Sequence, residues 1–429
     1  SSCMMRALLS FAFLFSASTV KVHADDDFPQ QIHIAAGSRT SFRVSWKTTD
    51  VTASTCLFGP TSDNLNRSVF GPPGYQYLKD HGFHHTVLLD ELPMGSRYFY
   101  SCGDGDALMS PVIGFNTAPS PSDEVSMAIF GDWGYLDSEA RPMEPVIGNL
   151  GGLHANWTAT LTRELLETLK ENAQISMLWV TGDIGYADDS FGHQGAVITF
   201  GYEPCFDGFM QWNENISKIM PFMVSVGNHE SECHDPYCLL HVESTGVPLS
   251  NFSAYNARFK MPSPESGGAL SMWASWEWGP VHITSLNTET DFEGAGEEFT
   301  GDGHFSFLPA GGFGLYEGEY LAWLEADLAK AAANPDVSWL VAGGHRPFED
   351  LPAAMQSHLQ ALFLKHGVAM YFAGHGHTYT RFDSGAWGDG AVHVMAGGAG
   401  NEETLFPADQ FDDVSPLTTT TAAAAAATT

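Results

Sequence analysis

The first part of the chain, from about Pro29 to Thr117, is a series of short runs in which apolar and polar residues alternate or β-branched and aromatic residues gather. Such runs are typical of half-buried strands, and turn-forming residues separate them. The expected strands are Gln31–Ile34, Ser41–Trp46, His85–Leu89 and Tyr98–Ser101. Several short strands around one inward-pointing tryptophan predict a small β-sandwich, to which we assign residues 25–120.

The pattern changes after the Pro- and Ser-rich linker at residues 118–122. Short apolar runs now alternate with segments whose leucines recur at helical spacing, as in Ala159–Asn172 and Glu319–Ala333. This alternation predicts a mixed α/β domain over residues 121–410. Its other predicted helices are Phe206–Ile219 and Ala353–His366, and its predicted strands are Val125–Phe130, Met177–Val180, Phe222–Val226, Val281–Leu286, Trp339–Ala342, Ala369–Phe372 and Val392–Met395.

Five of these strands end in glycine followed closely by aspartate, asparagine or histidine. The five segments are Gly131-Asp132-Trp133-Gly134, Gly182-Asp183-Ile184-Gly185-Tyr186, Gly227-Asn228-His229-Glu230, Gly343-Gly344-His345 and Gly374-His375-Gly376-His377. A single Gly-Asp pair is an ordinary turn, but five such segments, each after a strand, are hard to obtain by chance. Because ligands collect at the carboxyl ends of strands in α/β sheets, the set predicts a binding site there.

The residue types in these segments suit a pair of metal ions. A compact aspartate carboxylate can bridge two cations, and carboxylate and phenolate favour a hard ion such as Fe³⁺. Imidazole and amide oxygen suit a divalent ion such as Zn²⁺, Mn²⁺ or Fe²⁺. Such a pair lowers the pKa of bound water and clamps the oxygens of a phosphoryl group. The chemistry therefore indicates hydrolysis of a phosphate ester.

The five segments resemble the five sequence blocks of the purple acid phosphatases, which belong to the calcineurin-like metallophosphoesterases. Tyr186 separates this family from most of its relatives. The N-terminal region resembles the family's fibronectin-III-like domain, and the likeness runs from about Pro29 to Glu402. The resemblance implies an α/β (α+β) fold, a metallophosphoesterase β-sandwich flanked by helices and preceded by a small all-β sandwich domain.

The resemblance also implies a role for each matching residue. The implied metal ligands are Asp132, Tyr186 and His377 for the ferric ion, Asn228, His345 and His375 for the divalent ion, and Asp183 as the bridge between them. His229 is the implied catalytic residue, beside the substrate phosphate, where an imidazole could bind an oxygen or protonate the leaving group. A phenolate-to-iron bond from Tyr186 would make the protein purple.

The implied function is that of a secreted acid phosphatase that hydrolyses small phosphate monoesters through a metal-bound hydroxide. Two alternatives stay open. A phosphodiesterase or nucleotide pyrophosphatase could use the same scaffold, because the ligand set does not exclude it. A catalytically silent binding protein is the other alternative, but it predicts missing ligands and none is missing.

The chain departs from the family pattern in two blocks. Ala342 stands where valine is usual before the His345 block, which is a mild change. Many members have a histidine about nine or ten residues after that ligand, near the leaving group. Here Ala354 and Met355 occupy that place, and His358 comes later. The proton donor is therefore expected to be His229 alone or another residue; His193 and Glu230 are weaker candidates.

The net charge of the chain limits the kinds of molecule that it can bind. The chain of 429 residues has 51 Asp and Glu against 18 Lys and Arg, a formal net charge of −33. Such a surface repels nucleic acids and anionic membranes. An anionic substrate must therefore be held locally, and a metal centre is a natural means of doing so.

The N-terminus has the pattern of a signal peptide, assigned to residues 1–24. Met4-Met5-Arg6 precedes the apolar run Ala7–Val20, and Val22-His23-Ala24 follows. The run is too short for a membrane span, so we expect no stable membrane anchor. The expected destination is outside the cell, with the cell wall or a vacuole as alternatives. The tail at residues 411–429 is of low complexity and ends in threonine and alanine alone.

Export predicts disulfides and glycans. Cys56 and Cys102 could pair within the N-terminal region, and one pair is expected among Cys205, Cys233 and Cys238, which leaves one thiol over. Which two of the three would pair is left open. Sequons predict glycosylation at Asn66, Asn156, Asn215 and Asn251.

Overall fold

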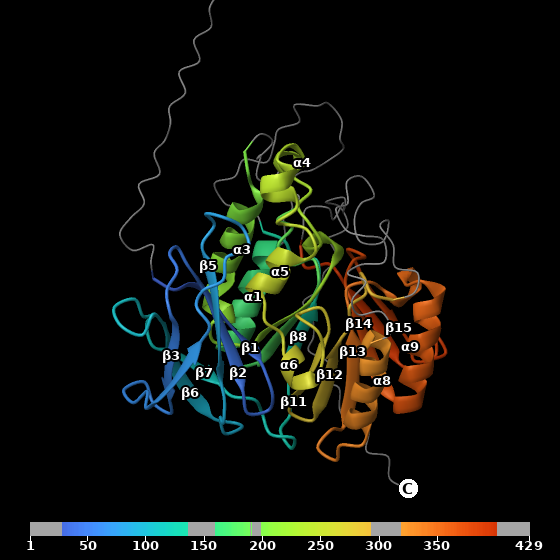
Figure 1. Ribbon diagram of the computed structural model, residues 1–429. Helices are drawn as coiled ribbons and strands as arrows, with labels where there is room; N and C mark the ends of the chain where they lie inside the picture. The colour runs from blue at the N-terminus through green and yellow to red at the C-terminus, as the bar shows by residue number, and fades with distance from the viewer. Residues whose placement is uncertain (1–27, 136–158, 189, 191–198, 293–318, 401–429) are drawn as a thin grey trace, which may run out of the picture.

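The computed structural model describes residues 28–135, 159–188, 190, 199–292 and 319–400. The predicted signal peptide (1–24) and the predicted tail (411–429) lie outside the described residues. In Figure 1 the N-terminal strands form one side of the molecule, and helices flank the sheets of the remainder. Among the described residues, no helix has the length and hydrophobicity of a membrane-spanning segment.

The N-terminal strands form two antiparallel sheets, as predicted. One has the order β1-β2-β5 and the other β4-β3-β6-β7. Trp46 points inward and stacks on His85, with ring centroids 5.1 Å apart. The strands are β1 (Gln30–Ala36), β2 (Phe42–Thr48), β3 (Ser54–Gly59), β4 (Arg67–Gly71), β5 (Phe83–Leu89), β6 (Arg97–Gly103) and β7 (Ile113–Asn116).

Three of these strands, β3, β4 and β7, were not expected from the sequence. β4 and β7 lie at the two edges of their sheet and are only five and four residues long. Their periodicity is therefore too short to stand out. β3 pairs with β6, and the disulfide Cys56–Cys102 joins these two strands at directly paired positions.

Two further sheets make the β-sandwich of the second domain. The first has the order β10-β9-β8, and all its strands are parallel. The second has the order β11-β12-β13-β14-β16-β15, with parallel strands in the middle and antiparallel strands at both edges. The strands are β8 (Met127–Phe130), β9 (Met177–Thr181), β10 (Phe222–Ser225), β11 (Ala274–Trp278), β12 (Val281–Ser285), β13 (Trp339–Gly343), β14 (Val368–Ala373), β15 (Tyr379–Phe382) and β16 (Val392–Ala396).

The core lies between these two sheets. Trp179 on β9 meets Trp276 on β11 edge to face, with ring centroids 5.6 Å apart, and also contacts Phe372 on β14. A hydrogen bond of 2.8 Å between the hydroxyls of Ser225 and Ser285 crosses the same space. The packed aromatic layer holds the two sheets in a fixed relation, so the loops at their ends are fixed as well.

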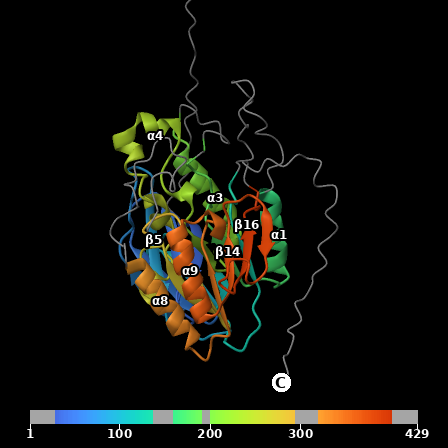
Figure 2. The same ribbon diagram turned by 90° about the vertical axis from the view of Figure 1, so that its right-hand side faces the viewer.

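Helices cover the outer faces. α8 (Glu319–Ala332) and α9 (Ala353–His366) pack against the six-stranded sheet, as Figure 2 shows, and α1 (Ala159–Glu171) packs against α3 (Tyr202–Ser217). The apolar face predicted for α1 is only partly buried: Leu166 is buried, but Leu161 and Leu165 are exposed. The shorter helical segments are η1 (Asn228–Glu230), α4 (Pro236–Leu240), η2 (Val242–Gly246), α5 (Ser253–Arg258), α6 (Ser263–Ser266) and η3 (Phe348–Asp350).

A buried charge network joins the two domains. Arg258 on α5 is 1% exposed, and its Nη2 lies 2.7 Å from Glu203 Oε2 and 2.8 Å from Asp207 Oδ1. Lys47 on β2 of the N-terminal domain reaches the same Asp207 at 2.6 Å. Each of these charged side chains has a partner of opposite sign, and this pairing offsets the cost of burying charge at the interface.

Candidate metal centre

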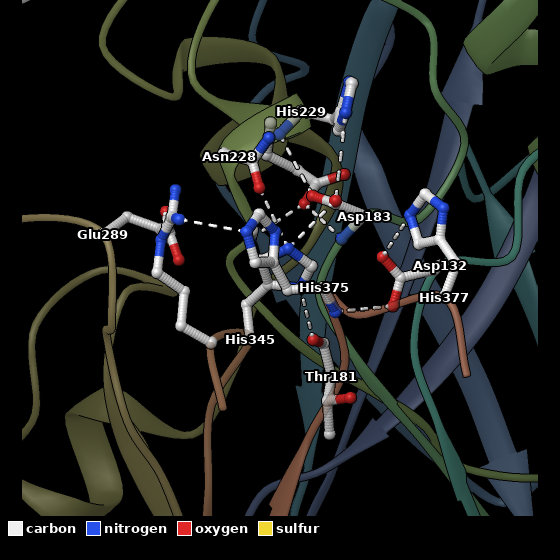
Figure 3. Close-up of polar contacts among 12 residues, drawn as sticks. Asp132, Thr181, Asp183, Asn228, His229, Glu289, His345, His375 and His377 are labelled. Carbon is white, nitrogen blue, oxygen red and sulfur yellow. Dashed lines mark hydrogen bonds and ion pairs between the residues drawn. The ribbon is translucent and has the colours of Figure 1, made fainter. Parts of the chain in front are cut away.

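The five glycine-containing segments meet at one edge of the sandwich. Strands β8, β9 and β10 are parallel, and so are β13 and β14, so the carboxyl ends of each set lie together. Figure 3 shows the side chains that follow these strand ends converging on a common centre. Eight residues predicted to form the site are brought together: Asp132, Asp183, Tyr186, Asn228, His229, His345, His375 and His377.

Three of them form a first cluster. The Tyr186 hydroxyl lies 3.2 Å from Asp132 Oδ1 and 3.1 Å from His377 Nε2. His377 Nε2 is in turn 3.2 Å from the same Asp132 oxygen. These are the residues that the family resemblance assigns to the ferric ion.

A second cluster gathers on the other side of Asp183. His345 Nε2 lies 3.0 Å from Asn228 Oδ1 and 2.9 Å from Asp183 Oδ2. One ligand atom each from Asp183, His345 and His375 lie within 4.8 Å of one another. These are the residues assigned to the divalent ion and the bridge.

The carboxylate of Asp183 belongs to both clusters, because its Oδ2 also lies 3.4 Å from the Tyr186 hydroxyl. Ligands about 2.1 Å from one ion and at right angles to each other stand about 3 Å apart. The spacing of the donor atoms in both clusters agrees with that value, and oxygen and nitrogen are the donors that Fe³⁺ and divalent ions accept. The residues present therefore fit a pair of metal ions.

Neighbouring backbone groups aim several of these donors. Asp132 accepts a hydrogen bond at Oδ2 from the backbone N–H of His375, at 2.8 Å, so its Oδ1 faces the first cluster. Asp183 accepts one at Oδ1 from the backbone N–H of His229, at 3.0 Å. His345 donates Nδ1–H to the carbonyl oxygen of Thr181, at 2.9 Å, and so presents Nε2 to the second cluster (Figure 3). Such outer partners are what orients metal ligands.

The backbone at the site is strained. Asp132, Asp183, Tyr186 and His375 all have φ between 51° and 66°, the left-handed region that non-glycine residues avoid. Each such residue costs about 1–3 kcal/mol unless its surroundings hold it in place. Gly182 has φ of 90°, and a Cβ there would lie 2.7 Å from His345 Cγ. The glycine thus lets the histidine approach the β9 turn.

Burial and charge shift the protonation of the cluster. Burial tends to raise the pKa of Asp183, but His345 and His229 outweigh it, so the pKa is lowered. Burial works against a charged His345, yet Asp183 raises its pKa to about 9. Burial, together with the charges of His345 and Arg346, lowers the pKa of His375 to about 3. A metal ion would therefore displace a proton from His345 on binding.

His229 is held by an aspartate that the sequence analysis did not single out. Its Nδ1 donates to Asp188 Oδ2 at 2.9 Å, and its Nε2 lies 4.0 Å from Asp183 Oδ2. Its ring packs on that of Tyr186, with centroids 4.3 Å apart. His234 shares the same Asp188 oxygen at 3.0 Å. The position of Asp188 in the sequence could have indicated its role, since it follows the predicted metal ligand Tyr186 by two residues.

Glu230 does not face the cluster as a proton donor would. It is buried and accepts backbone N–H groups from Asp183, Ile184 and Gly227, at 2.9, 2.8 and 2.9 Å. Burial, followed by the charge of Asp183, raises the pKa of its carboxyl to about 8. Its contacts indicate that it ties the β9 and β10 turns together.

The residues near the place of the family's further histidine lie on α9. Met355 is buried in α9 and His358 is exposed on the same helix. His193 and Asn156 lie outside the described residues. The other three sequon residues, Asn66, Asn215 and Asn251, are exposed, and their glycosylation stays a prediction.

The cysteines follow the expected count. Cys56 pairs with Cys102 and Cys233 pairs with Cys238. Cys205 is buried outside both disulfides, with Sγ 3.6 Å from the carbonyl oxygen of Gly185. The second disulfide ties α4 to the segment that carries His234.

Comparison with known proteins agrees with this geometry. Residues 126–379 match the family model of the calcineurin-like phosphoesterases, and residues 29–117 match that of the purple acid phosphatase N-terminal domain. The chain belongs to the purple acid phosphatases, within the calcineurin-like phosphoesterases. It is therefore a phosphatase, and the family implies a binuclear metal centre. This membership decides against the silent binding protein.

Similar proteins come from plants and fungi. Purple acid phosphatase 23 of Arabidopsis thaliana is 28% identical, over 90% of this chain and 82% of the relative. Acid phosphatase A of Cryphonectria parasitica is 26% identical, over 93% and 86%. The structure of purple acid phosphatase PPD1 from yellow lupin (Lupinus luteus) seeds shares the fold, with a TM-score of 0.61 at 18% identity, over 87% of this chain and 65% of that one.

Proposed function

We propose that this purple acid phosphatase is secreted and hydrolyses phosphate monoesters in acid solution at an Fe³⁺–M²⁺ centre, where M is zinc, manganese or iron. The observation that supports the proposal most is the shared position of Asp183. Its carboxylate joins a tyrosine-containing cluster to one built from an amide and two imidazoles. The first cluster offers a phenol oxygen and a carboxylate, which a ferric ion prefers. The second offers an amide oxygen and two imidazoles, which a divalent ion prefers.

The ions would be held by the residues that the two clusters contain. Asp132, Tyr186 and His377 would hold the ferric ion, Asn228, His345 and His375 the divalent ion, and Asp183 would contact both. When bound, such a pair activates water as a nucleophile and neutralises charge on the phosphoryl oxygens. All seven donors come from turns fixed by the packed sheets, which meets the requirement that a catalytic site be preorganised.

His229 is the group that acts on the substrate. Asp188 fixes its orientation through Nδ1, so Nε2 faces the cluster beside Asp183. From there Nε2 can hold a phosphate oxygen or, when protonated, transfer its proton to the leaving alkoxide.

Secretion is supported by the leader-like N-terminus and by the two disulfides, since disulfides persist mainly in oxidising compartments. Three exposed sequon asparagines are compatible with glycosylation on that route. Expression with the native N-terminus tests this: secretion predicts activity in the medium and a mature chain that begins near residue 25. Activity retained inside the cell on an uncut chain would contradict it.

The reaction is tested by phosphate release from an aryl phosphomonoester between acid and neutral pH, with Asp183→Ala as the blank. The expected result is activity that peaks on the acid side and is absent from the variant. An aryl phosphodiester is assayed alongside. Faster turnover of the diester would favour the phosphodiesterase alternative, and full activity with full metal content in Asp183→Ala would overturn the assigned centre.

A further inference from the structure

His234 shares with His229 a single oxygen of Asp188. Nδ1 of His229 lies 2.9 Å from Asp188 Oδ2, and Nδ1 of His234 lies 3.0 Å from the same atom. Asp188 is fully buried, whereas the His229 side chain is 6% exposed and the His234 side chain 18%. The three groups thus connect a partly exposed imidazole to the one that lies beside Asp183, as Figure 3 shows for the latter.

The second imidazole determines how firmly the carboxylate is held. Each imidazole donates its Nδ1–H to Oδ2 of Asp188, and a carboxylate oxygen has two lone pairs, so both are used. The other oxygen, Oδ1, is buried and has no hydrogen-bond partner among the described residues. The last torsion of an aspartate side chain has broad minima. With His229 as the only donor, no hydrogen bond at Oδ1 would oppose a turn of the carboxylate.

The segment that carries His234 is fixed on both sides of this residue. Cys233 forms a disulfide with Cys238, which lies on α4. Asp235 accepts a hydrogen bond at Oδ2 from the hydroxyl of Ser190, at 2.5 Å. One neighbour of His234 is therefore tied to α4 and the other to the segment that follows Tyr186. An imidazole on such a segment loses little conformational freedom when it binds the carboxylate.

We propose that His234 is a positioning residue, which fixes the Asp188 carboxylate and, through it, the His229 ring in the orientation that presents Nε2 to the substrate. The inference deepens the proposed function and rests on the role given there to His229. Nε2 of His229 lies 4.0 Å from Asp183 Oδ2, so a tilt of the ring moves the atom that acts on the substrate. A misplacement of about 1 Å in a reacting group can cost about 100-fold in rate.

The rival interpretation is that His234 only stabilises the segment on which it lies. A purely structural role lowers stability or metal content, and it reduces activity whether His229 is present or not. A positioning role needs His229, so the effect of replacing His234 should vanish once His229 has been replaced. A double-mutant cycle on these two residues separates the two interpretations.

The variants are chosen to remove or keep one donor. His234→Leu and His234→Asn introduce side chains of similar size, but only asparagine has an N–H group, bonded to Cγ as Nδ1 is in histidine, that can donate to Asp188. His234→Ala adds no new bulk and covers the case in which His234→Leu does not fold. The control is His241→Leu, because His241 is exposed just after α4 and its Nδ1 bonds to the carbonyl oxygen of Tyr237. Each is made with and without His229→Gln.

We expect kcat for the aryl monoester to fall about tenfold in His234→Leu and His234→Ala at matched metal content, which is the effect of one hydrogen bond. His234→Asn and His241→Leu should stay within about twofold of wild type, since both keep a donor to Asp188. In the His229→Gln background, His234→Leu should change kcat by less than about twofold, because the ring that it orients is gone.

A second measurement does not depend on activity. In the full chain labelled with nitrogen-15 histidine and loaded with zinc, which is diamagnetic, the Nδ1-bound proton of His229 should give a signal that its bond to Asp188 protects from exchange with water. Loss of the signal in His229→Gln identifies it. The signal should persist in His234→Asn and broaden or vanish in His234→Leu.

An equal loss of kcat from His234→Leu with and without His229 would overturn the inference. So would a His234→Asn enzyme as slow as His234→Leu, or a loss that disappears when excess metal restores full occupancy. A wild type that does not turn over the monoester would count against the proposed function instead, and the His229 signal would still decide the role of His234.

Discussion

Glu230 accepts a hydrogen bond from the backbone N–H of Asp183, 2.9 Å away, across 47 residues of sequence. The same Glu230 oxygen accepts from Gly227, which precedes Asn228. One buried carboxylate thus sets the distance between the turn that carries the shared ligand and the turn that carries the amide ligand.

Replacing this carboxylate should loosen metal binding. Glu230→Gln keeps the shape but turns one acceptor oxygen into an NH₂ group, which cannot accept the backbone N–H groups it would face. Loss of such an outer partner typically costs 10- to 100-fold in metal affinity, so we expect a loss of about that size. Metal titration of Glu230→Gln against the exposed control Glu325→Gln measures it; equal affinities would show that Glu230 does not position the turns.

Tyr186 provides a test of the ferric ion. If a phenolate binds iron, the loaded protein absorbs visible light, and Tyr186→Phe should lose the band because its hydroxyl contacts at 3.1–3.4 Å disappear. Tyr255→Phe is the matched control, a buried tyrosine whose hydroxyl bonds to the carbonyl of Ser271 instead. A retained band in loaded Tyr186→Phe would remove the phenolate from the centre.

A second buried cluster should make stability depend on pH. His282 Nε2 lies 3.0 Å from Asp327 Oδ2 and its Nδ1 lies 3.5 Å from Glu277 Oε1. Burial opposes its charge, but the hydrogen bond to Asp327 and the nearby carboxylate of Glu277 raise its pKa to about 9. The raised pKa stabilises the fold fully below the unfolded value of about 6.5, and this contribution disappears as pH rises toward 9.

We therefore expect the free energy of unfolding to fall by up to about 3 kcal/mol between pH 6.5 and 9. Denaturation across this range should show the slope in wild type and in His358→Gln, whose histidine is exposed. His282→Gln should lack that part of the slope. The same slope in all three proteins would place its origin elsewhere.

Arg258 should be essential to the union of the two domains. Removing one partner of a buried ion pair costs about 3–5 kcal/mol, because a charge is left uncompensated. Arg258→Met removes the 2.7 Å ion pair of Glu203, which is 1% exposed and keeps Lys47 Nζ at 3.6 Å, so we expect a loss in the free energy of unfolding near the lower end of that range, about 3 kcal/mol. Arg67→Met, which breaks an exposed pair with Glu91, should cost less than about 1 kcal/mol. Similar losses in both variants would show that the buried network is not what joins the domains.

The order of the main strands and helices, and the chemical character of the site, follow from the amino-acid pattern alone. The short continuous apolar run at Met177–Thr181 predicts a buried strand, and the leucines that recur at helical spacing in Glu319–Ala332 predict a helix. The residue types that can bind metal ions are present in the glycine-containing segments and can be read directly from the sequence. Short edge strands such as β4, β7 and β15 were not predicted, because four or five residues are too few to establish an alternation of apolar and polar positions.

The groups that contact and orient the site residues could be identified from the folded protein but not from the sequence. Asp188 contacts His229, which is 41 positions away in the sequence, and Arg346 Nε lies 2.9 Å from Glu289 Oε2 although the two residues are 57 positions apart. Such contacts depend on how two sheets pack, because packing sets the distance between turns to within a few tenths of an ångström. The left-handed backbone of Asp132 and Asp183 has the same origin: local preference opposes it, and the surrounding fold maintains it.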